Sequence, residues 1–520
     1  MKVKRSDGGS QAKDIVAAFS RGLRLIEALA AGGDLVSPSE LAGRVKLDRA
    51  VVRRLLMTLD RFGYVTAGVR GYRLAPMVRE LAFAYLDSIG ITGAFERALS
   101  QVSHLLGETV SVSVSDGDEM VVVARADMSG RRLSYIVPPG TRFALAESAS
   151  GVAWLSGLSE QAAWDIVGKQ SLRGAAGALA AEVEAARSSG FATRTNEYEM
   201  GQFAIACPIP HPRNRASIVL QVEPLEAPRD PDAYIMAKAP LIRKHIQFLS
   251  ESLFDVPGGT PPAAFLRENS NEPAAVASFE RGVDLISRFG SNFRAGTIAT
   301  VARENNLDRA VARRLLKTLV AGGYAQVEDD VYSLTARILR LGFYQVGHLT
   351  MPELFQPQLE RLALAIDEST SAYVLDNGEA LCIARSDITG RRMGYMINKG
   401  SRLPLAYSAS GRVLLSTLPE DMRLRLLRDM PPPPTSHSVI GVHQVLAEVA
   451  EAGRQGYAIS NQELDEGMLS MAVLVRDRDG NSVGTLGCSS HVSRMSLERL
   501  KAEVLPKFIV AANELSRIIH

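Results

Sequence analysis

The sequence predicts an α+β protein in which one plan occurs twice: a winged helix-turn-helix domain followed by a mixed domain of helices and strands. Two observations predict this fold class. A basic and apolar segment at residues 47–59 recurs at residues 307–319, with eleven of thirteen positions identical at an offset of 260. The strand-like and turn-like segments that follow the first copy recur at the same offset. At 520 residues, the chain is long enough for several such domains.

The basic segment is predicted to be a helix with one apolar face and one arginine-bearing face. Its apolar residues recur at three- and four-residue spacing from Leu47 to Leu59, and Asp48 stands at the N-cap position. Upstream, Ser37 and Pro38 predict the start of another short helix. Two short helices in succession, the second rich in arginine, form the helix-turn-helix pattern. The alternative is an ordinary amphipathic helix with solvated arginines, and the second copy of the same arginines weakens that alternative.

Downstream of the helix, residues 64–74 predict a β-hairpin with a basic tip, which is typical of a wing. If the helix lies in the major groove, its N-terminal turns meet base edges, and guanidinium groups match guanine. The residues predicted to contact bases are Arg49, Arg53, Arg309 and Arg313. Those predicted to contact phosphates are Arg54, Arg314, the hairpin residue Arg70 and Ser37 at the helix start. For Arg54, a salt bridge within its own domain is the alternative.

The charge distribution favours a specific DNA-binding protein over a general polycation. The net charge of the chain is only +2, whereas residues 37–65 and residues 297–325 each carry +3. The rest of the chain therefore sums to 2 − 6 = −4. A local basic patch on a near-neutral protein is the electrostatic footprint of sequence-specific DNA binding.

Cysteine usage and hydropathy point to the cytoplasm. Cys207, Cys382 and Cys488 form no CxxC pair, so neither a disulfide framework nor a zinc module is indicated. The N-terminus lacks an apolar signal region, and no apolar run approaches the length of a membrane helix. We expect no metal, no cofactor and no membrane partner.

The mixed domain is expected to contain five or so strands with helices before, between and after them. The strict alternation of residues 109–114 predicts a strand with one wet face. Further strands are expected at 120–124, 132–137, 203–209 and 217–223, and helices at 95–102, 151–189 and 234–253. The Pro-, Gly- and Asn-rich residues 255–275 predict a linker. The offset becomes 266 by Glu463, so the second copy gains six residues.

With both halves laid out, the chain resembles the IclR family of bacterial transcription regulators, most of all the branch that controls aromatic-acid catabolism. The first signals are the Arg21-Gly22 helix start and a helix ending Arg-Leu-Leu-x-Thr-Leu-x-x-x-Gly-Tyr. Further signals are the segment Gly-Thr/Ser-Arg-x-x-x-x-x-Ser-Ala-Ser-Gly at 140–151 and 400–411, and Glu-x-x-x-Gly at 197–201 and 463–467. A usual family member has one winged domain and one effector domain and dimerises, so this chain looks like a fused dimer.

The resemblance implies two winged helix-turn-helix domains and two GAF-like effector-binding domains in tandem. The expected domains are 1–75 (DNA-binding), 76–90 (linker helix), 91–254 (effector-binding), 255–275 (inter-repeat linker), 276–335 (DNA-binding), 336–350 (linker helix) and 351–520 (effector-binding).

The resemblance also implies a small-acid site between the strands of the effector domain and its serine-rich segment. Carried over, the site residues of the first copy are Tyr135, Ala149, Ser150, Gln202, Gln221 and Glu223. Those of the second copy are Tyr395, Ala409, Ser410, Met468, Gly487 and Ser489. Alternation puts Val219 with Gln221 and Glu223 on the ligand face of its strand, and Gly411 fits a backbone that approaches a ligand closely. The alternative is that these polar residues satisfy turns and strand ends.

The two effector domains are expected to differ. Glu223 is a poor neighbour for a carboxylate ligand because like charges repel at short range, whereas Ser489 is a good one. Arg412 and Pro404 match the family pattern, but Val152 and Ala144 do not. We therefore expect the second copy to be the better acid sensor.

The predicted partners are double-stranded operator DNA and a small organic acid, and a homodimer of the tandem chain and contact with RNA polymerase stay open. A ligand-sensing scaffold that does not bind DNA is one alternative, which a flat salt dependence would favour. An enzyme is the other, but the chain has no GxSxG, HExxH, P-loop or dinucleotide fingerprint.

Overall fold

Each basic segment forms the second helix of a helix-turn-helix, as predicted. The first copy consists of α1 (Ala17–Ala30), α2 (Pro38–Val45), α3 (Arg49–Arg61) and the wing strands β1 (Val65–Gly68) and β2 (Gly71–Leu74). The second copy consists of α10 (Ala277–Ser287), α11 (Ile298–Glu304), α12 (Arg309–Ala321), β9 (Ala325–Glu328) and β10 (Val331–Leu334). The winged helix-turn-helix prediction is confirmed in both copies.

The structure is a computed structural model, and the chain divides into two compact units, residues 1–348 and 349–520. It describes residues 15–32, 35–68, 70–128, 137–169, 176–195, 197, 202–210, 218–224, 228–253, 276–290, 293–343, 349–388, 397–428 and 430–519. The expected inter-repeat linker at 255–275 lies outside these residues.

Both helix starts of the first copy follow the sequence prediction in position, but only one is capped by a side chain. The Ser37 hydroxyl accepts a hydrogen bond from the N–H of Glu40 at 3.2 Å, with Pro38 in the first turn. Asp48 and Asp308 are N-cap residues by backbone geometry, yet neither side chain makes a capping hydrogen bond. They therefore favour the helix start through their charge alone.

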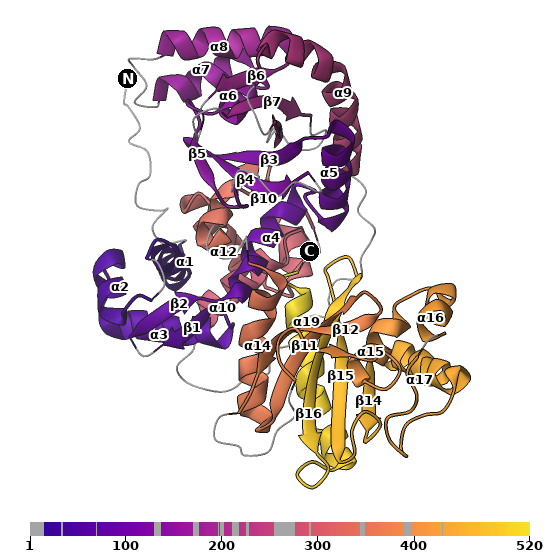
Figure 1. The fold of residues 1–520 in the computed structure, drawn as a ribbon. Helices are drawn as coiled ribbons and strands as arrows, with labels where there is room; N and C mark the ends of the chain where they lie inside the picture. The colour runs from indigo at the N-terminus through magenta and orange to yellow at the C-terminus, as the bar shows by residue number, and fades with distance from the viewer. Residues whose placement is uncertain are drawn as a thin grey trace. The chain divides into compact units, whose positions relative to one another are not determined.

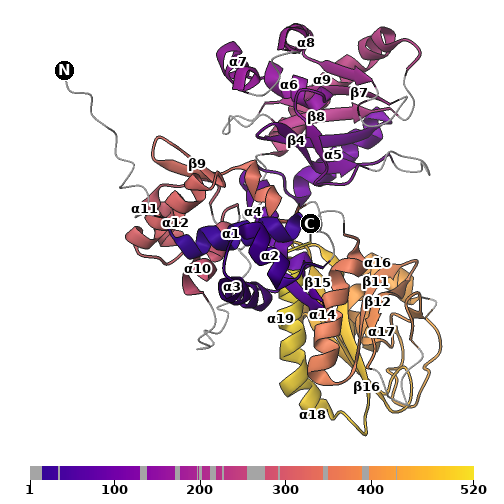
Figure 2. The same ribbon diagram turned by 90° about the vertical axis from the view of Figure 1, so that its left-hand side faces the viewer.

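The two helix-turn-helix domains pack against each other within the first unit, where α1 lies beside α10 and α12 (Figure 2). The Phe279 ring sits so close to Gly22 that an added Cβ would come within 2.3 Å of it. Likewise, a Cβ added at Gly282 would come within 2.4 Å of the Phe19 ring. Because each pair is the other shifted by 260 residues, the contact is isologous, as in a twofold dimer.

Reciprocal hydrogen bonds continue this symmetry from the first helix of one copy to the arginine-bearing helix of the other. The N–H of Val16 donates to Thr318 Oγ1 at 2.9 Å, and the N–H of Val276 donates to Thr58 Oγ1 at 3.2 Å. Both threonines are buried. Each copy thus positions the arginine-bearing helix of the other.

The segments after the two wings differ in form. The first is a short 3₁₀ turn followed by a helix, and the second is a 3₁₀ helix that ends at Gly342, whose φ is 115°. These elements are η2 (Pro76–Val78), α4 (Arg79–Ser88) and η3 (Ala336–Leu341).

An ion-pair cluster joins η3 to the first mixed domain. Arg340 Nε lies 2.6 Å from Asp116 Oδ2, and its Nη2 lies 3.1 Å from Glu119 Oε2. Arg142 Nη1 pairs with the same two carboxylates, at 2.8 Å from Asp116 Oδ2 and 2.9 Å from Glu119 Oε2. The mixed domain of the first copy is therefore bonded to the segment that follows the second wing.

The first mixed domain is a six-stranded antiparallel sheet with helices on both faces. The strand order is β5-β4-β3-β8-β7-β6. Helices α5 and α9 pack on one face, and α6 packs on the other, with α7 and α8 beyond it (Figure 1). The elements are α5 (Gly93–Leu106), β3 (Thr109–Asp116), β4 (Glu119–Ala126), β5 (Arg142–Ala144), α6 (Ala149–Ser156), α7 (Glu160–Lys169), α8 (Ala176–Ser189), β6 (Ala192–Thr195), β7 (Phe203–Ile209), β8 (Ile218–Glu223) and α9 (Pro231–Ser252).

Four of the expected strands appear in this sheet, and their faces differ from the prediction. The expectation that 109–114 has one wet face is wrong, because both faces of β3 are covered by helices and its residues are mostly buried. The strands β5 and β6 at the sheet edges were not predicted. Residues 132–136 of the expected third strand lie outside the part of the chain that the structure describes.

The second unit repeats this domain with the strand order β13-β12-β11-β16-β15-β14. Helices α14 and α19 cover one face of the sheet, and α15 covers the other, with α17 packed on α15 (Figure 1). The elements are α14 (Met351–Ile366), β11 (Ser369–Asp376), β12 (Glu379–Ser386), β13 (Arg402–Leu403), α15 (Ala409–Ser416), α16 (Glu420–Leu427), α17 (Val442–Gln455), β14 (Tyr457–Asn461), β15 (Met468–Arg476), β16 (Ser482–His491), α18 (Leu497–Arg499), η4 (Leu500–Val504) and α19 (Leu505–Ser516).

The close approach of α1 and α10 generates a stability prediction. We expect Gly22→Val to destabilise the DNA-binding pair by about 1–3 kcal/mol, because the new side chain would overlap the Phe279 ring in a packed core. The matched control is Gly43→Ala in α2, where an added Cβ meets nothing within 4 Å. Denaturant unfolding of the full chain measures both. Equal midpoints for the two variants would contradict the packing described here.

Candidate functional site

The arginine faces of α3 and α12 are turned to solvent. Arg49, Arg53 and Arg54 are exposed on α3, as are their counterparts Arg309, Arg313 and Arg314 on α12. None of the six guanidinium groups forms an ion pair or hydrogen bond with another described residue, so the structure does not show the salt bridge considered for Arg54. Six free cations on two related helices can meet phosphates and base edges.

The opposite face of each helix is firmly held in its domain. In α3 the side chains of Val52, Leu55, Leu56 and Leu59 are buried, and the equivalent side chains of α12 are buried as well. Of the other predicted DNA contacts, Arg70 is exposed at the wing tip and Ser37 is half-buried at the start of α2. All eight predicted residues therefore lie on the helix-turn-helix domains, and six lie on the arginine-bearing helices.

A polar cavity lies in the second mixed domain, between the start of α15 and strands β11, β15 and β16. Five of the predicted effector residues line it: Ala409, Ser410, Met468, Gly487 and Ser489. The other lining residues, which the sequence did not indicate, are Ser371, Tyr373, Leu403, Ser408, Leu464, Ser470, Met471 and Cys488. The sixth predicted residue, Tyr395, lies outside the described residues, as does Tyr135 in the first copy.

The cavity is small. Its volume of about 20 Å³ is room for a water molecule, so an aromatic ring would have to displace lining side chains. Met468 and Met471 are suited to such movement because the methionine side chain is unbranched and flexible.

The serine-rich segment shapes the wall of the cavity. Ser408 Oγ accepts a hydrogen bond from the N–H of Gly411 at 3.1 Å and donates one to the Pro404 carbonyl at 2.7 Å, which fixes the start of α15. The expectation that Gly411 serves a close ligand is wrong. An added Cβ there would lie 2.4 Å from Leu405 Cα, so the glycine is required by the protein's own backbone.

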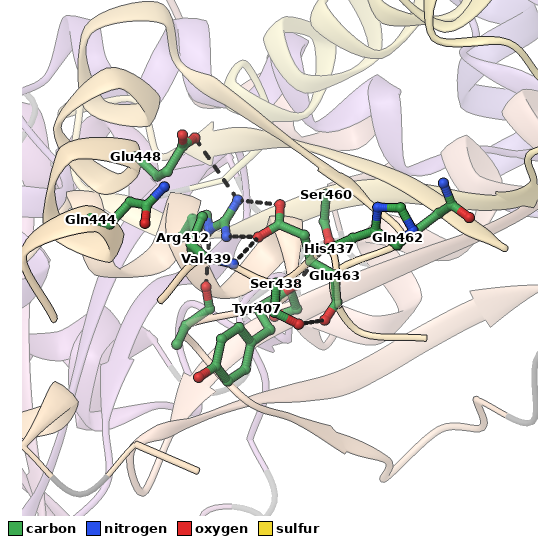
Figure 3. Close-up of polar contacts among 12 residues, drawn as sticks. Tyr407, Arg412, His437, Ser438, Val439, Gln444, Glu448, Ser460, Gln462 and Glu463 are labelled. Atoms are coloured by element: carbon green, nitrogen blue, oxygen red, sulfur yellow. Dashed lines mark hydrogen bonds and ion pairs between the residues drawn. The ribbon is translucent and has the colours of Figure 1, made fainter. Parts of the chain in front are cut away.

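Behind this wall, the second copy holds a buried ion pair between Arg412 and Glu463 (Figure 3). Arg412 is only 1% exposed; its Nη1 donates to Glu463 Oε1 at 2.8 Å, its Nη2 donates to Glu463 Oε2, and its Nε donates to the Ala406 carbonyl at 3.0 Å. Ser438 Oγ donates to the Glu463 carbonyl at 2.7 Å. The pair is therefore neutralised and fixed by further hydrogen bonds.

The first copy has lost the cation of this pair. Val152 stands where Arg412 does, and Glu197, the counterpart of Glu463, has no hydrogen-bond partner for either carboxylate oxygen among the described residues. Burial raises the pKa of Glu197 to about 8, and the nearby charge of Glu223 contributes, while the Ala149 N–H and Arg194 lower it. The carboxyl of Glu197 therefore stays protonated at neutral pH.

The remaining predicted residues of the first copy form a buried polar cluster. Glu223 Oε1 accepts hydrogen bonds from Ser111 Oγ at 3.0 Å and Gln221 Nε2 at 3.1 Å, and its Oε2 lies 2.9 Å from Arg125 Nη1. Gln202 is fully buried and accepts the N–H of Glu197 at 3.1 Å.

At the start of α6, the two predicted residues of the first copy belong to the helix cap. Ala149 and Ser150 are both buried there, and Ser150 Oγ donates to Ser148 Oγ at 3.3 Å.

The prediction that Val219 faces a ligand on β8 is wrong. Val219 packs in the apolar core with Ala149 and Val152 of α6, while Gln221 and Glu223 lie further along the same strand. Alternation puts Val219 on the same face of the strand as Gln221 and Glu223, but only the tertiary structure shows how far the core extends along that face.

Helices with solvent-exposed arginines, joined to a domain that encloses a serine-lined cavity, define a ligand-controlled DNA-binding regulator. Comparison with models of known protein families supports this class. A model of the IclR helix-turn-helix domain matches residues 18–67 and 278–329, and one of the bacterial transcriptional regulator IclR C-terminal domain matches residues 83–229 and 344–517. The chain belongs to the IclR family of bacterial transcriptional regulators.

The most similar relatives each span about half of this chain. The Pca regulon regulatory protein of Pseudomonas putida is 30% identical over 256 residues, which cover 49% of this chain and 88% of the relative. The p-hydroxybenzoate hydroxylase transcriptional activator of Acinetobacter baylyi is 28% identical over 249 residues, covering 47% and 92%. The chain thus holds two family members in tandem.

A solved structure is similar to part of this chain. It is the inducer-binding domain of the PobR transcription factor from Acinetobacter, a double mutant in complex with 3-hydroxybenzoic acid. The two are 27% identical, the match covers 32% of this chain and 98% of that one, and the TM-score is 0.31.

The part of the chain that the structure describes contains neither a candidate metal site nor a candidate membrane span. No group of three or more His, Cys, Asp or Glu residues there is arranged to hold a metal ion. No helix in that part of the chain is long and apolar enough to cross a membrane.

Replacing the carboxyl of Glu197 or of Glu463 by an amide is expected to change the stability of the protein in opposite directions. Because the pKa of Glu197 is raised, its stabilising contribution is complete below about pH 4.5 and is lost as the pH rises through about 8. We therefore expect Glu197→Gln to be more stable than the wild type at pH 9 and similar at pH 5.

The matched variant in the second copy is Glu463→Gln. It leaves Arg412 buried without its carboxylate and should cost about 3–5 kcal/mol at both pH values. Denaturant titrations at pH 5 and pH 9 compare the three proteins. An unchanged pH dependence in Glu197→Gln would rule out the raised pKa.

Proposed function

We propose that this regulator presents both reading helices of a DNA-binding dimer from one polypeptide. Helices α3 and α12 would each enter the major groove at one of two similar half-sites. The supporting observation is the pair of exposed arginine faces, held in one unit by reciprocal packing of α1 and α10. Arg49, Arg53 and their counterparts would contact base edges, because the N-terminal turns of a recognition helix meet the bases.

The covalent connection strengthens operator binding in this proposal. Once one half-site is bound, the second reading helix is already held nearby, so its binding is effectively intramolecular. Arg54, Arg314, Arg70 and Ser37 would contact phosphates and set the position of the domains on the duplex.

We propose that the effector is an organic acid of the hydroxybenzoate type, bound in the cavity of the second unit. Two relatives are named for the pca regulon and for p-hydroxybenzoate hydroxylase. The cavity offers serine hydroxyls for a carboxylate and the Tyr373 ring for an aromatic group. The protein would act in the cytoplasm. Association into a homodimer of tandem chains and contact with RNA polymerase are compatible with this function.

The paired reading helices predict that each arginine acts at its own half-site. We expect Arg49→Ala and Arg309→Ala each to weaken binding by about 1–3 kcal/mol, one at each half of the operator, because a bidentate guanine contact is lost. Footprinting on operators selected from random DNA would show protection lost on opposite sides. The control is Arg425→Ala, an exposed arginine on α16. If both variants bind selected and random DNA like the control, the reading assignment fails.

The effector proposal predicts a matched pair of cavity variants. Both Ala409 and its counterpart Ala149 pack in apolar clusters, and Ala409 in addition lines the cavity of the second unit. We expect Ala409→Val to weaken 4-hydroxybenzoate binding about tenfold, since overpacking costs about 1–3 kcal/mol and each 1.4 kcal/mol is tenfold. Ala149→Val should leave it unchanged. Calorimetry on the full chain measures both, and an equal loss of affinity would place the ligand elsewhere.

A further inference from the structure

The buried carboxylate of Glu223 occupies a prepared carboxylate site in the first effector domain. Ser111, Gln221 and Arg125 all donate to it, at 2.9–3.1 Å. The Glu223 side chain is 1% exposed, and that of Arg125 is 6% exposed. A carboxylate that accepts two neutral donors and one guanidinium is as well satisfied as a bound acid would be.

The second copy keeps the donors of this site. Strand pairing places Ser489 opposite Ser369 exactly as it places Glu223 opposite Thr109, so the two strands have the same register. Three positions are identical in the two copies: Ser111 and Ser371, Arg125 and Arg385, and Asp127 and Asp387. Arg385 Nη1 donates to Ser371 Oγ at 3.1 Å, and Ser371 lines the cavity.

The second copy changes the two residues that fill the site. Gln221 is replaced by Gly487, and Glu223 is replaced by Ser489. Both changes shorten side chains on the same strand, and both shorter residues line the cavity of the second unit. The second copy therefore has a small cavity where the first copy has two long polar side chains.

The charge balance of the two sites changes with these residues. Arg125 has the buried carboxylate of Glu223 and the exposed one of Asp127 beside it. Arg385, with a side chain 7% exposed, keeps Asp387, whose side chain is 58% exposed. The position of Glu223 thus carries no carboxylate in the second copy, where Ser489 stands instead, and a buried guanidinium favours a carboxylate there.

We propose that Glu223 is a built-in substitute for the effector carboxylate, so that the first effector domain is permanently filled and only the second takes an organic acid. In the second domain, the acid's carboxylate would bind at Ser371, Ser489 and Arg385. This inference deepens the proposed function, on whose acid effector it rests. It makes the protein a regulator that binds one acid for each pair of reading helices.

The assignment also identifies position 223, and its counterpart 489, as the determinant of which copy responds. A glutamate there fills the carboxylate site from within, and a serine leaves it open to a free acid. The single substitution Glu223→Ser should therefore create a second carboxylate site, and Ser489→Glu should close the existing one.

The deciding comparison is between the full-length variants S489E and E223S/S489E. Both carry a filled second site, and only the double variant has an opened first site. Acetate is the probe because it is a carboxylate small enough for the opened space beside Gln221. We expect acetate to raise the unfolding midpoint of E223S/S489E in a concentration-dependent manner, with no such rise in S489E. Acetamide, which has the same shape without the charge, should raise neither.

Two further variants protect the test against misfolding. E223Q retains the shape of the side chain and should not respond to acetate, because the amide still fills the site. Q221G/E223S in the S489E background reproduces both residues of the second copy and should respond to benzoate as well as acetate. A variant that folds only in the presence of a carboxylate has no unfolding midpoint without ligand. For such a variant, the refolding yield in acetate is compared with the refolding yield in acetamide.

A matching acetate response in S489E and E223S/S489E would overturn the proposal, and so would the absence of any response in both opened variants. Neither result depends on the wild-type effector. Failure of the wild type to bind hydroxybenzoates would contradict the proposed effector, while a carboxylate-specific response of E223S/S489E would still establish the built-in site.

Discussion

The insertion of one phenylalanine from each copy against a glycine of the other is the contact on which the DNA-binding half of the molecule depends. At Gly22 and Gly282, α1 and α10 leave no room for a β-carbon, so the two helices approach as closely as the Phe279 and Phe19 rings allow. The hydrogen bonds from Val16 and Val276 then reach the threonines on the underside of α12 and α3. A reading helix is thus positioned by both copies at once, and its arginine face remains free.

The covalent connection between the two copies allows each copy to change its sequence independently of the other. In a homodimer, a substitution appears on both sides of the twofold axis, whereas in a tandem chain each copy can change alone. The DNA-binding halves have kept their arginines and their reciprocal packing. The effector-binding domains have diverged at the proposed ligand site and behind it, where Val152 and Glu223 stand in place of the residue types found at Arg412 and Ser489. Without a counterpart of Arg412, Glu197 is a buried carboxyl whose pKa is raised to about 8, mainly by burial.

The contact between Arg340 and the hairpin carboxylates of the first effector domain crosses the two copies. Asp116 and Glu119 hold the segment that follows the second wing, as well as Arg142 of their own domain. If the carboxylate site of the first effector domain is always occupied by Glu223, the contact of that domain with Arg340 would not change with the effector. Variation with the effector would then originate in the second domain, whose equivalent carboxylates, Asp376 and Glu379, bind Arg402 of their own copy.

The sequence by itself determined the duplication, the winged helix-turn-helix domains and the arginine faces, because these are periodic and local: helix spacing, capping residues and a repeat offset. It also indicated that the two effector domains differ at Glu223 and Ser489. Only the tertiary structure decided what surrounds those residues. Ser111 and Arg125 are far from Glu223 along the chain and bond to it because their strands pair, and pairing brings Ser371 and Arg385 to the strand neighbouring that of Ser489 or to the one beyond it. The wet face expected for β3 and the ligand contact expected for Val219 on β8 were wrong for the same reason, since a strand covered by helices on both sides shows its surroundings only when the layers are assembled.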